Sequence, residues 1–157
     1  MMAQGLVQFD NGSWNFEDGI DRMVYADVVG GTLLDQPTYQ AGLFELRGAD
    51  WVQLGGLCSF DFGGFTLPGQ WAWDGADRAV SVANKVDTTL QVRVFDGTGL
   101  FKGQSDPFTF KNAGNEPAGT TDPLMFGLRA FALVPEPSTI ALGVLGLGAL
   151  LLFRRRS

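Results

Sequence analysis

Hydrophobic and polar residues alternate along several segments of the chain, and this pattern predicts β-strands. The two-residue period is most regular in the segment 89–95, and it recurs in 22–29 and 124–133. Each of these segments is expected to form a strand with one hydrophobic face. The hydrophobic positions are Leu90, Val92 and Val94 in the first segment, Val24, Ala26 and Val28 in the second, and Leu124, Phe126, Leu128 and Ala130 in the third.

Shorter segments with weaker strand patterns lie between these, and turn-forming residues separate nearly all of them. Short strands at such intervals are typical of a sandwich or jelly roll. We therefore predict an all-β fold, an antiparallel sandwich or jelly roll, for residues 1–134, with the polar segment 112–123 as a surface loop. The shorter segments are 6–9, 43–46, 51–54, 57–62, 70–73, 79–82 and 108–110, and the turn signals are Asp10-Asn11-Gly12, Gly30-Gly31, Gly63-Gly64, Asp74-Gly75 and Asp96-Gly97.

The C-terminal residues 135–157 differ from the rest of the chain. Residues 138–153 carry no charge, and Arg154, Arg155 and Arg156 follow them. As a helix this segment would be about 24 Å long, shorter than the roughly 30 Å hydrocarbon core, so spanning requires snorkelling arginines or a thinned bilayer. We predict one C-terminal transmembrane helix with the arginines as a cytoplasmic stop and the preceding domain outside. A buried C-terminal helix of the domain is the alternative, but it would not need a terminal triple arginine.

Pro135, Glu136 and Pro137 precede this apolar segment, and both prolines favour an extended, exposed backbone that suits recognition or cleavage. From Val134 onward, the sequence resembles the PEP-CTERM sorting signal of bacteria. The resemblance covers the final 24 residues. It implies processing at the Pro-Glu-Pro motif by an exosortase, a membrane-embedded cysteine protease-like enzyme, in bacteria that also make exopolysaccharide. It also implies delivery to the cell surface or matrix.

Proteins with this signal normally begin with a signal peptide, whereas the present start, MMAQGLVQF, has no basic or apolar leader region. We therefore expect the leader to lie upstream of this start, with Ala3-Gln4 as the remnant of a cleavage site. Parts of the predicted body are similar to uncharacterised domains that often precede such tails, which implies a shared β domain of unknown role. These parts are Val24-Tyr25-Ala26, Ala41-Gly42-Leu43-Phe44, 91–96 and Gly103-Gln104-Ser105.

Composition removes several functional classes. Before Val134 the chain has 16 Asp and Glu against 8 Lys and Arg, so nucleic-acid binding is not expected. Histidine is absent and Cys58 is the single cysteine, which excludes a Ser-His-Asp triad, a Cys-His dyad and a zinc site of His and Cys ligands. Between Leu57 and Phe60, Cys58 is expected to be a small buried hydrophobic residue.

Trp71 and Trp73 are the candidate glycan-binding residues. They lie two residues apart, so a strand would point both indoles to one face, and paired indoles commonly stack on sugar rings. Packing of both rings in the core is the alternative, because buried aromatic residues are common in β domains.

Carboxylates suggest two further chemistries, each with a simpler explanation. Aspartates in predicted turns could hold calcium, although Asp is favoured in turns for its own hydrogen bonds. Any two suitably spaced glutamates could form a glycosidase pair, although dispersed acids usually serve solvation. We therefore expect no metal, no cofactor and no catalysis. The residues in question are Asp10, Asp74, Asp77, Asp96 and Asp106 for calcium, and Glu17, Glu45 and Glu116 for catalysis.

The sequence thus predicts a noncatalytic exported protein of the cell surface or extracellular matrix. Its first location would be the cell envelope, anchored through residues 138–153 with the body outside, and processing would then leave it on the surface or secreted. The partners implied by the resemblance are an exosortase-type enzyme and, through the matrix, exopolysaccharide. A carbohydrate-binding module or a small glycosidase acting on exopolysaccharide is the alternative.

Overall fold

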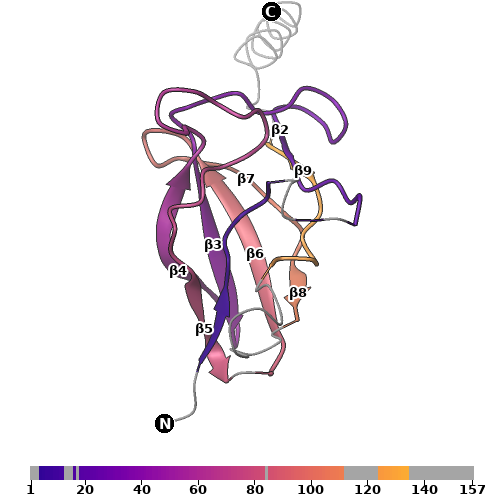
Figure 1. Cartoon of the computed structure of the whole chain (residues 1–157), viewed down its shortest axis with the longest axis vertical. Helices are drawn as coiled ribbons and strands as arrows, with labels where there is room; N and C mark the ends of the chain where they lie inside the picture. Colours follow the sequence, from indigo (N-terminus) through magenta and orange to yellow (C-terminus); the bar gives the residue numbers. More distant parts are fainter. Residues whose placement is uncertain (1–3, 13–15, 17, 84, 112–123, 135–157) are drawn as a thin grey trace, which may run out of the picture.

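The computed structural model describes residues 4–12, 16, 18–83, 85–111 and 124–134. Nine strands and no helix occur among these residues, which confirms the all-β prediction for this part of the chain (Figure 1). The strands are β1 Gln4–Val7, β2 Val24–Tyr25, β3 Gln40–Arg47, β4 Asp50–Ser59, β5 Arg78–Ala83, β6 Thr88–Phe95, β7 Phe101–Gln104, β8 Phe108–Phe110 and β9 Phe131–Ala132.

Five strands form the main sheet, in which all pairs are antiparallel. Its order is β4-β3-β6-β7, and β8 also pairs with β6. The predicted strand 89–95 is confirmed as β6, whose Leu90, Val92 and Val94 are fully buried. Ser105 lies between β7 and β8 and continues the hydrogen bonding to β6. Val92 N donates to Ser105 Oγ at 3.0 Å, and Ser105 N donates to Val92 O at 2.9 Å.

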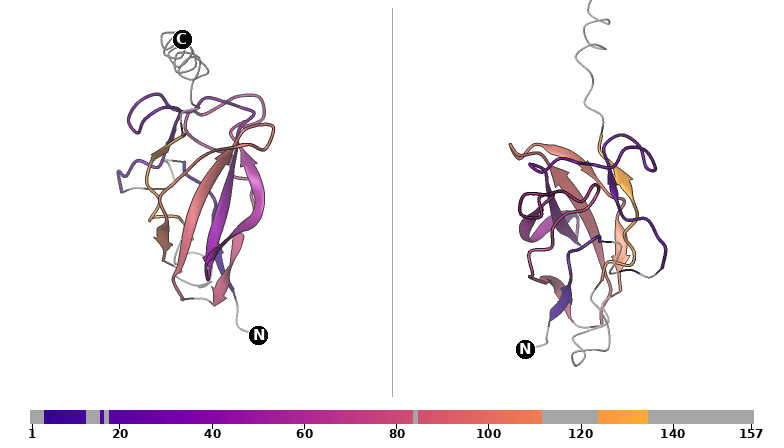
Figure 2. Two further views of the ribbon diagram at one scale, coloured as in Figure 1. Left: turned by 180° about the vertical axis from the view of Figure 1, so that it is seen from behind. Right: turned by 45° about the horizontal axis from the view of Figure 1, so that its top comes forward.

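The second layer consists of two short strand pairs and irregular segments (Figure 2). β1 pairs with β5 antiparallel, whereas β2 pairs with β9 parallel. Side chains from irregular segments fill the space between these pairs and the main sheet, and together they form one hydrophobic core. The described sheets are therefore not closed into a complete sandwich or jelly roll. The core residues from irregular segments include Phe9, Leu34, Phe60, Trp71, Met125 and Leu128.

Two of the three long strand predictions are wrong over most of their length. In the segment 22–29 only β2 pairs, because a turn follows in which Gly31 N donates to Val28 O at 2.9 Å. In the segment 124–133 only β9 pairs, and Phe126, predicted to face the core, is half exposed. The segment 70–73 forms no strand, and the predicted loop 112–123 lies outside the described residues.

Strand directions bring three connections to the same end of the body as the last described residue. β6 ends at Phe95, which lies opposite Gln40 and Phe101, and Gln40 in turn lies opposite Ser59. We call this end the tail end, formed by residues 26–38, 60–69 and 96–102 together with Val134. β1 begins at the opposite end of the molecule, beside the connection from β5 to β6 (Figures 1 and 2).

Candidate functional site

The chain is hydrogen-bonded to the body up to the last described residue. After β9, Leu133 N donates to Tyr25 O at 2.9 Å and Val134 N donates to Lys102 O at 2.8 Å. Gly103 on β7 permits this close approach, because a Cβ added there would lie 2.9 Å from Leu133 Cα. The position of Val134 at the tail end is therefore fixed by bonds to both neighbouring strands.

The residues that follow Val134 carry the signal found in the sequence. Comparison with known protein families matches residues 133–157 to the PEP-CTERM protein-sorting motif. The chain ends in a PEP-CTERM sorting motif. The match begins at Leu133, directly after β9, and it implies export, membrane association and processing by an exosortase-type enzyme. Neither the curated proteins nor the solved structures contain a match to this chain.

The predicted sorting residues themselves lie outside the described part of the chain. This holds for Pro135, Glu136 and Pro137, for the apolar segment 138–153 and for the arginines 154–156. Among the described residues, no helix is long and apolar enough to cross a membrane. The structure therefore shows the surface of the body at which the PEP-CTERM motif starts.

Aspartates close the loops of this surface by accepting hydrogen bonds from loop amides. Asp27 Oδ1 accepts from Val28 N at 2.7 Å and from Thr32 N at 2.9 Å, and these bonds hold the pKa of Asp27 below its usual range. Asp96 Oδ1 accepts from Thr98 Oγ1 at 2.7 Å and from Leu100 N at 3.0 Å, which lowers the pKa of Asp96 strongly. Both carboxylates are thus charged at neutral pH and directed at the backbone of their own loops.

A hollow of about 570 Å³ lies between two of these loops, lined by Asp35, Pro37, Asp61, Gly64, Phe65 and Thr66. Thr66 Oγ1 donates to Asp35 Oδ1, and Gly64 N donates to Asp61 Oδ1 at 2.6 Å. The exposed Phe65 ring stacks on Phe62 with centroids 5.8 Å apart. Two carboxylates beside an exposed ring form a surface suited to a cationic group.

The two tryptophans proposed as a glycan platform do not share an exposed face. Trp71 is 1% exposed, its ring packs on Phe9 at 4.8 Å between centroids, and its Nε1 donates to Phe9 O at 3.0 Å. Trp73 is 42% exposed and donates to Ala76 O at 3.3 Å. Trp71 is therefore a core residue, and only Trp73 is accessible to a ligand.

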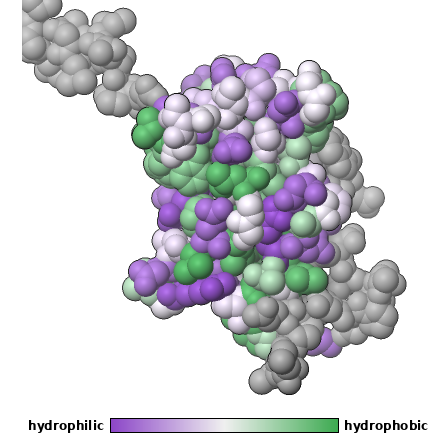
Figure 3. All heavy atoms as spheres, turned by 90° about the vertical axis from the view of Figure 1, so that its left-hand side faces the viewer, coloured by the Kyte–Doolittle hydropathy of each residue, from purple (hydrophilic) through white to green (hydrophobic). Residues whose placement is uncertain are grey.

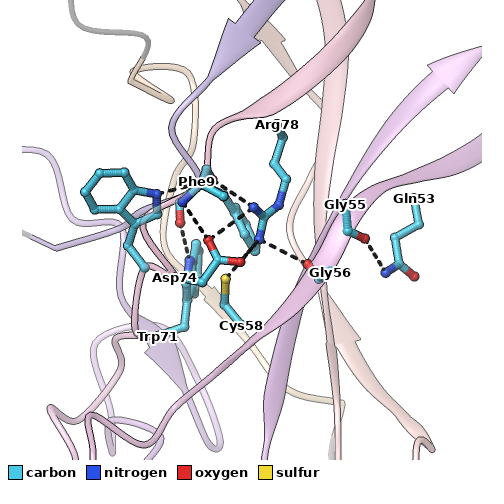
Figure 4. Close-up of polar contacts among 10 residues, drawn as sticks. Phe9, Gln53, Gly55, Gly56, Cys58, Trp71, Asp74 and Arg78 are labelled. Atoms are coloured by element: carbon cyan, nitrogen blue, oxygen red, sulfur yellow. Dashed lines mark hydrogen bonds and ion pairs between the residues drawn. The ribbon is translucent and has the colours of Figure 1, made fainter.

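Close to Trp71, Asp74 pairs with an arginine that joins β4 to β5 (Figure 4). Arg78 is almost fully buried and donates to both carboxylate oxygens of Asp74, at 2.7 and 3.1 Å, so the pKa of Asp74 is lowered. The same guanidinium donates to Gly56 O at 3.3 Å and lies 3.4 Å from Cys58 Sγ. Cys58 is buried, as expected from sequence, and this burial raises its thiol pKa. This cluster holds β4 and β5 together.

Three of the five carboxylates considered for calcium have other partners. Asp74 binds Arg78, Asp96 lies 3.1 Å from Lys102 Nζ, and Asp10 Oδ1 accepts from Gly12 N at 2.7 Å. Within the described ranges, no three His, Cys, Asp or Glu side chains are grouped so that they could hold a metal ion. The turn chemistry that Asp provides accounts for these positions.

Glu45 is the described member of the three glutamates considered for catalysis, since Glu17 and Glu116 lie outside the described residues. Its fully buried carboxylate accepts from Ser81 N at 3.0 Å, from Thr88 Oγ1 at 3.1 Å and from Arg47 Nε at 2.7 Å. These contacts join β3 to β5 and to the start of β6. Glu45 thus has a structural role and no access to a substrate.

Sequence reasoning missed the outer face of the main sheet, where aromatic and amide side chains lie in cross-strand register. Arg93 on β6 lies over the Phe44 ring at 4.6 Å and over the Trp51 ring at 5.6 Å. Gln53 lies opposite Phe44, and Gln104 lies opposite Arg93. The alternation of the strands carries this signal as well, because the residues between the buried positions of β6, such as Arg93, line the opposite face of the sheet.

Proposed function

We propose that this chain is a noncatalytic exported protein of the cell surface or extracellular matrix. In this proposal residues 138–153 hold it in the membrane as a helix, with Arg154 to Arg156 on the cytoplasmic side. The exosortase-type enzyme then recognises Pro135, Glu136 and Pro137 and releases the body or attaches it at the surface. The observation that carries the proposal is the PEP-CTERM match at residues 133–157, which starts where β9 ends.

The described structure supports a boundary between body and signal at residue 134. Val134 is hydrogen-bonded to the body and yet largely exposed, so the motif starts at the surface. A cut beyond it would remove none of the hydrogen bonds described above. A noncatalytic body is supported by Glu45 and Asp74, because both carboxylates are taken up by structural partners.

Intact mass and fractionation of the native protein from its own bacterium test this proposal. We expect an exported body that has lost the residues beyond about Pro137, because the sorting enzyme acts at or near the motif. The exported form and the full-length form are separated by the mass of the tail, so one spectrum distinguishes them. A full-length chain that stays in the inner membrane would identify a simple anchored protein and contradict sorting.

A second candidate function is binding of a neutral glycan from exopolysaccharide, and the outer face of the main sheet favours it. Phe44 is buried, so the ring of this face that can stack on a sugar is the partly exposed Trp51, while the exposed amides of Gln53 and Gln104 can both donate to and accept from hydroxyl groups. Arg93 is held over two rings of this face and adds further donors.

An exopolysaccharide array tests this candidate with a pair of tryptophan variants. We expect Trp51→Ala to weaken binding by about 1–3 kcal/mol, the range found when one aromatic ring that stacks on a nucleobase is removed, which is roughly 5- to 150-fold. Trp73→Ala removes an exposed indole elsewhere and should leave binding unchanged. Loss of binding only in Trp73→Ala would move the site to that residue, and absence of binding to every glycan would remove this function.

A further inference from the structure

The most exposed large hydrophobic side chains of the described structure gather at the tail end. Elsewhere in the described residues no large hydrophobic side chain is more than 50% exposed. Single exposed hydrophobic residues are normal, but their collection at one end of a molecule marks an interaction surface. The residues are Leu100 at 63%, Val28 and Val134 at 62%, Phe65 at 58% and Val29 at 56% exposure.

Loop geometry explains why Val28 and Leu100 point outward. Asp27 accepts the amide hydrogen of Val28, and Asp96 accepts that of Leu100, so each carboxylate turns toward its own loop. The apolar residues are left at the tips. In Figure 3 green residues lie at this end of the body beside the point where the described chain ends, among white and purple ones.

We propose that the tail end of the body rests on the lipid surface into which the tail inserts. This inference rests on the proposed function, because the membrane is the one entered by residues 138–153. Val134 belongs both to the exposed hydrophobic group and to the PEP-CTERM match, so the surface is continuous with the signal.

The length of chain between body and membrane keeps the tail end close to the membrane. Only residues 135–137 separate Val134 from the apolar segment, and three extended residues span at most about 11 Å. The headgroup layer itself is about 5–8 Å thick on each side of the hydrocarbon core. An apolar segment that starts at the edge of the hydrocarbon core therefore holds Val134 within a few ångströms of the headgroups, so a small tilt of the body is enough to bring the neighbouring loop tips into contact with lipid.

Charge at the tail end selects the kind of lipid. Its segments carry Asp27, Asp35, Asp61 and Asp96 against the single cation Lys102, which is paired with Asp96 at 3.1 Å. Anionic lipids are therefore repelled. The hollow beside Phe65 presents two carboxylates and a ring, which suits the ammonium group of a zwitterionic headgroup. On phosphatidylcholine, which has no net charge, contact through the apolar tips should be insensitive to salt, whereas salt should weaken the repulsion from anionic lipid.

Docking would orient the body so that Pro135, Glu136 and Pro137 lie in the interface, where a membrane-embedded enzyme acts. The loops would then position the motif for processing. Once the tail is removed, the tips alone provide a weak and reversible contact, which fits an exported body.

The test uses the full-length chain reconstituted in phosphatidylcholine vesicles, with an environment-sensitive fluorophore on one introduced cysteine. Cys58→Ala provides the background, and circular dichroism checks that each variant folds as the parent does. Val29→Cys and Leu100→Cys report on the tail end, and Val86→Cys, between β5 and β6, is the matched exposed control at the opposite end. Quenching by spin-labelled lipid measures contact with the membrane.

We expect a blue shift and loss of fluorescence at positions 29 and 100 and no change at 86, with weaker quenching when phosphatidylglycerol replaces phosphatidylcholine. Absence of quenching at 29 and 100 in chains that float with the vesicles would overturn the docking and leave the anchor intact. Equal quenching at 86 would also overturn it, because the body would then lie in another orientation. A chain that does not float at all would contradict both the docking and the membrane anchor of the proposed function.

Discussion

Replacing Pro135, Glu136 and Pro137 together by alanine is expected to abolish processing and to leave the full-length chain in the membrane. Two physical changes act in the same direction. The variant loses the extended backbone that two prolines impose, and with it the shape that the enzyme recognises. Alanine also allows the apolar helix to begin three residues earlier, so residues 135–153 would reach about 28 Å, close to the hydrocarbon thickness. The variant should therefore be a more permanent anchor.

This prediction is measured in a host that has the exosortase-type enzyme, by intact mass and by the distribution of the chain between membrane and exported fractions. Thr139→Ala is the matched control, because it changes a residue just beyond the motif and keeps both prolines and the glutamate. The control should be processed like the parent. Processing of the triple alanine variant at the parental rate would show that these three residues are not the recognised signal.

The parts of the fold that could be predicted are those in which local pattern and tertiary pairing agree. β6 has the most regular alternation and lies inside the main sheet, and the face predicted to be hydrophobic is the one that is buried in the core. Cys58 was assigned to the core from its apolar neighbours, and it is buried. The sorting motif is recognisable for the same reason, because its residues are contiguous and need no tertiary contact to identify them.

Where prediction failed, either hydrogen bonds within a turn or tertiary contacts decided the local structure. In the segment 22–29 the strand ends at Tyr25, although the alternation continues, because Asp27 and Gly31 form a turn that exposes Val28. β7 was not predicted, since Phe101 to Gln104 has little alternation and is defined by its pairing with β6. The expected pairing of Trp71 with Trp73 assumed a strand, and the segment instead inserts the first ring into the core.

The tail-end surface could not be predicted because its residues come from segments far apart in the sequence. Val28, Phe65 and Leu100 are brought together by strand pairing, such as that of Gln40 with both Ser59 and Phe95. Each residue alone looks like an ordinary apolar loop residue. Their relation to the PEP-CTERM motif becomes visible only through β9, which carries the chain to the same end.

The two tryptophans should also differ sharply in their effect on stability, and Trp71→Ala is expected to cost about 3–5 kcal/mol in the free energy of unfolding. The substitution would leave a cavity between Phe9 and Phe60, and Phe9 O would lose its hydrogen bond from the indole. A loss of this size is a large share of the roughly 5–15 kcal/mol that stabilises a typical domain.

Trp73→Ala is the matched comparison, because it removes the same side chain from an exposed position two residues away, and it should cost less than about 1 kcal/mol. Urea unfolding of the full-length variants in mild detergent, followed by circular dichroism, measures both values. Equal costs would mean that Trp71 does not belong to the core. The expected difference would mean that the fold requires Trp71. Trp73 could then be replaced without loss of the fold.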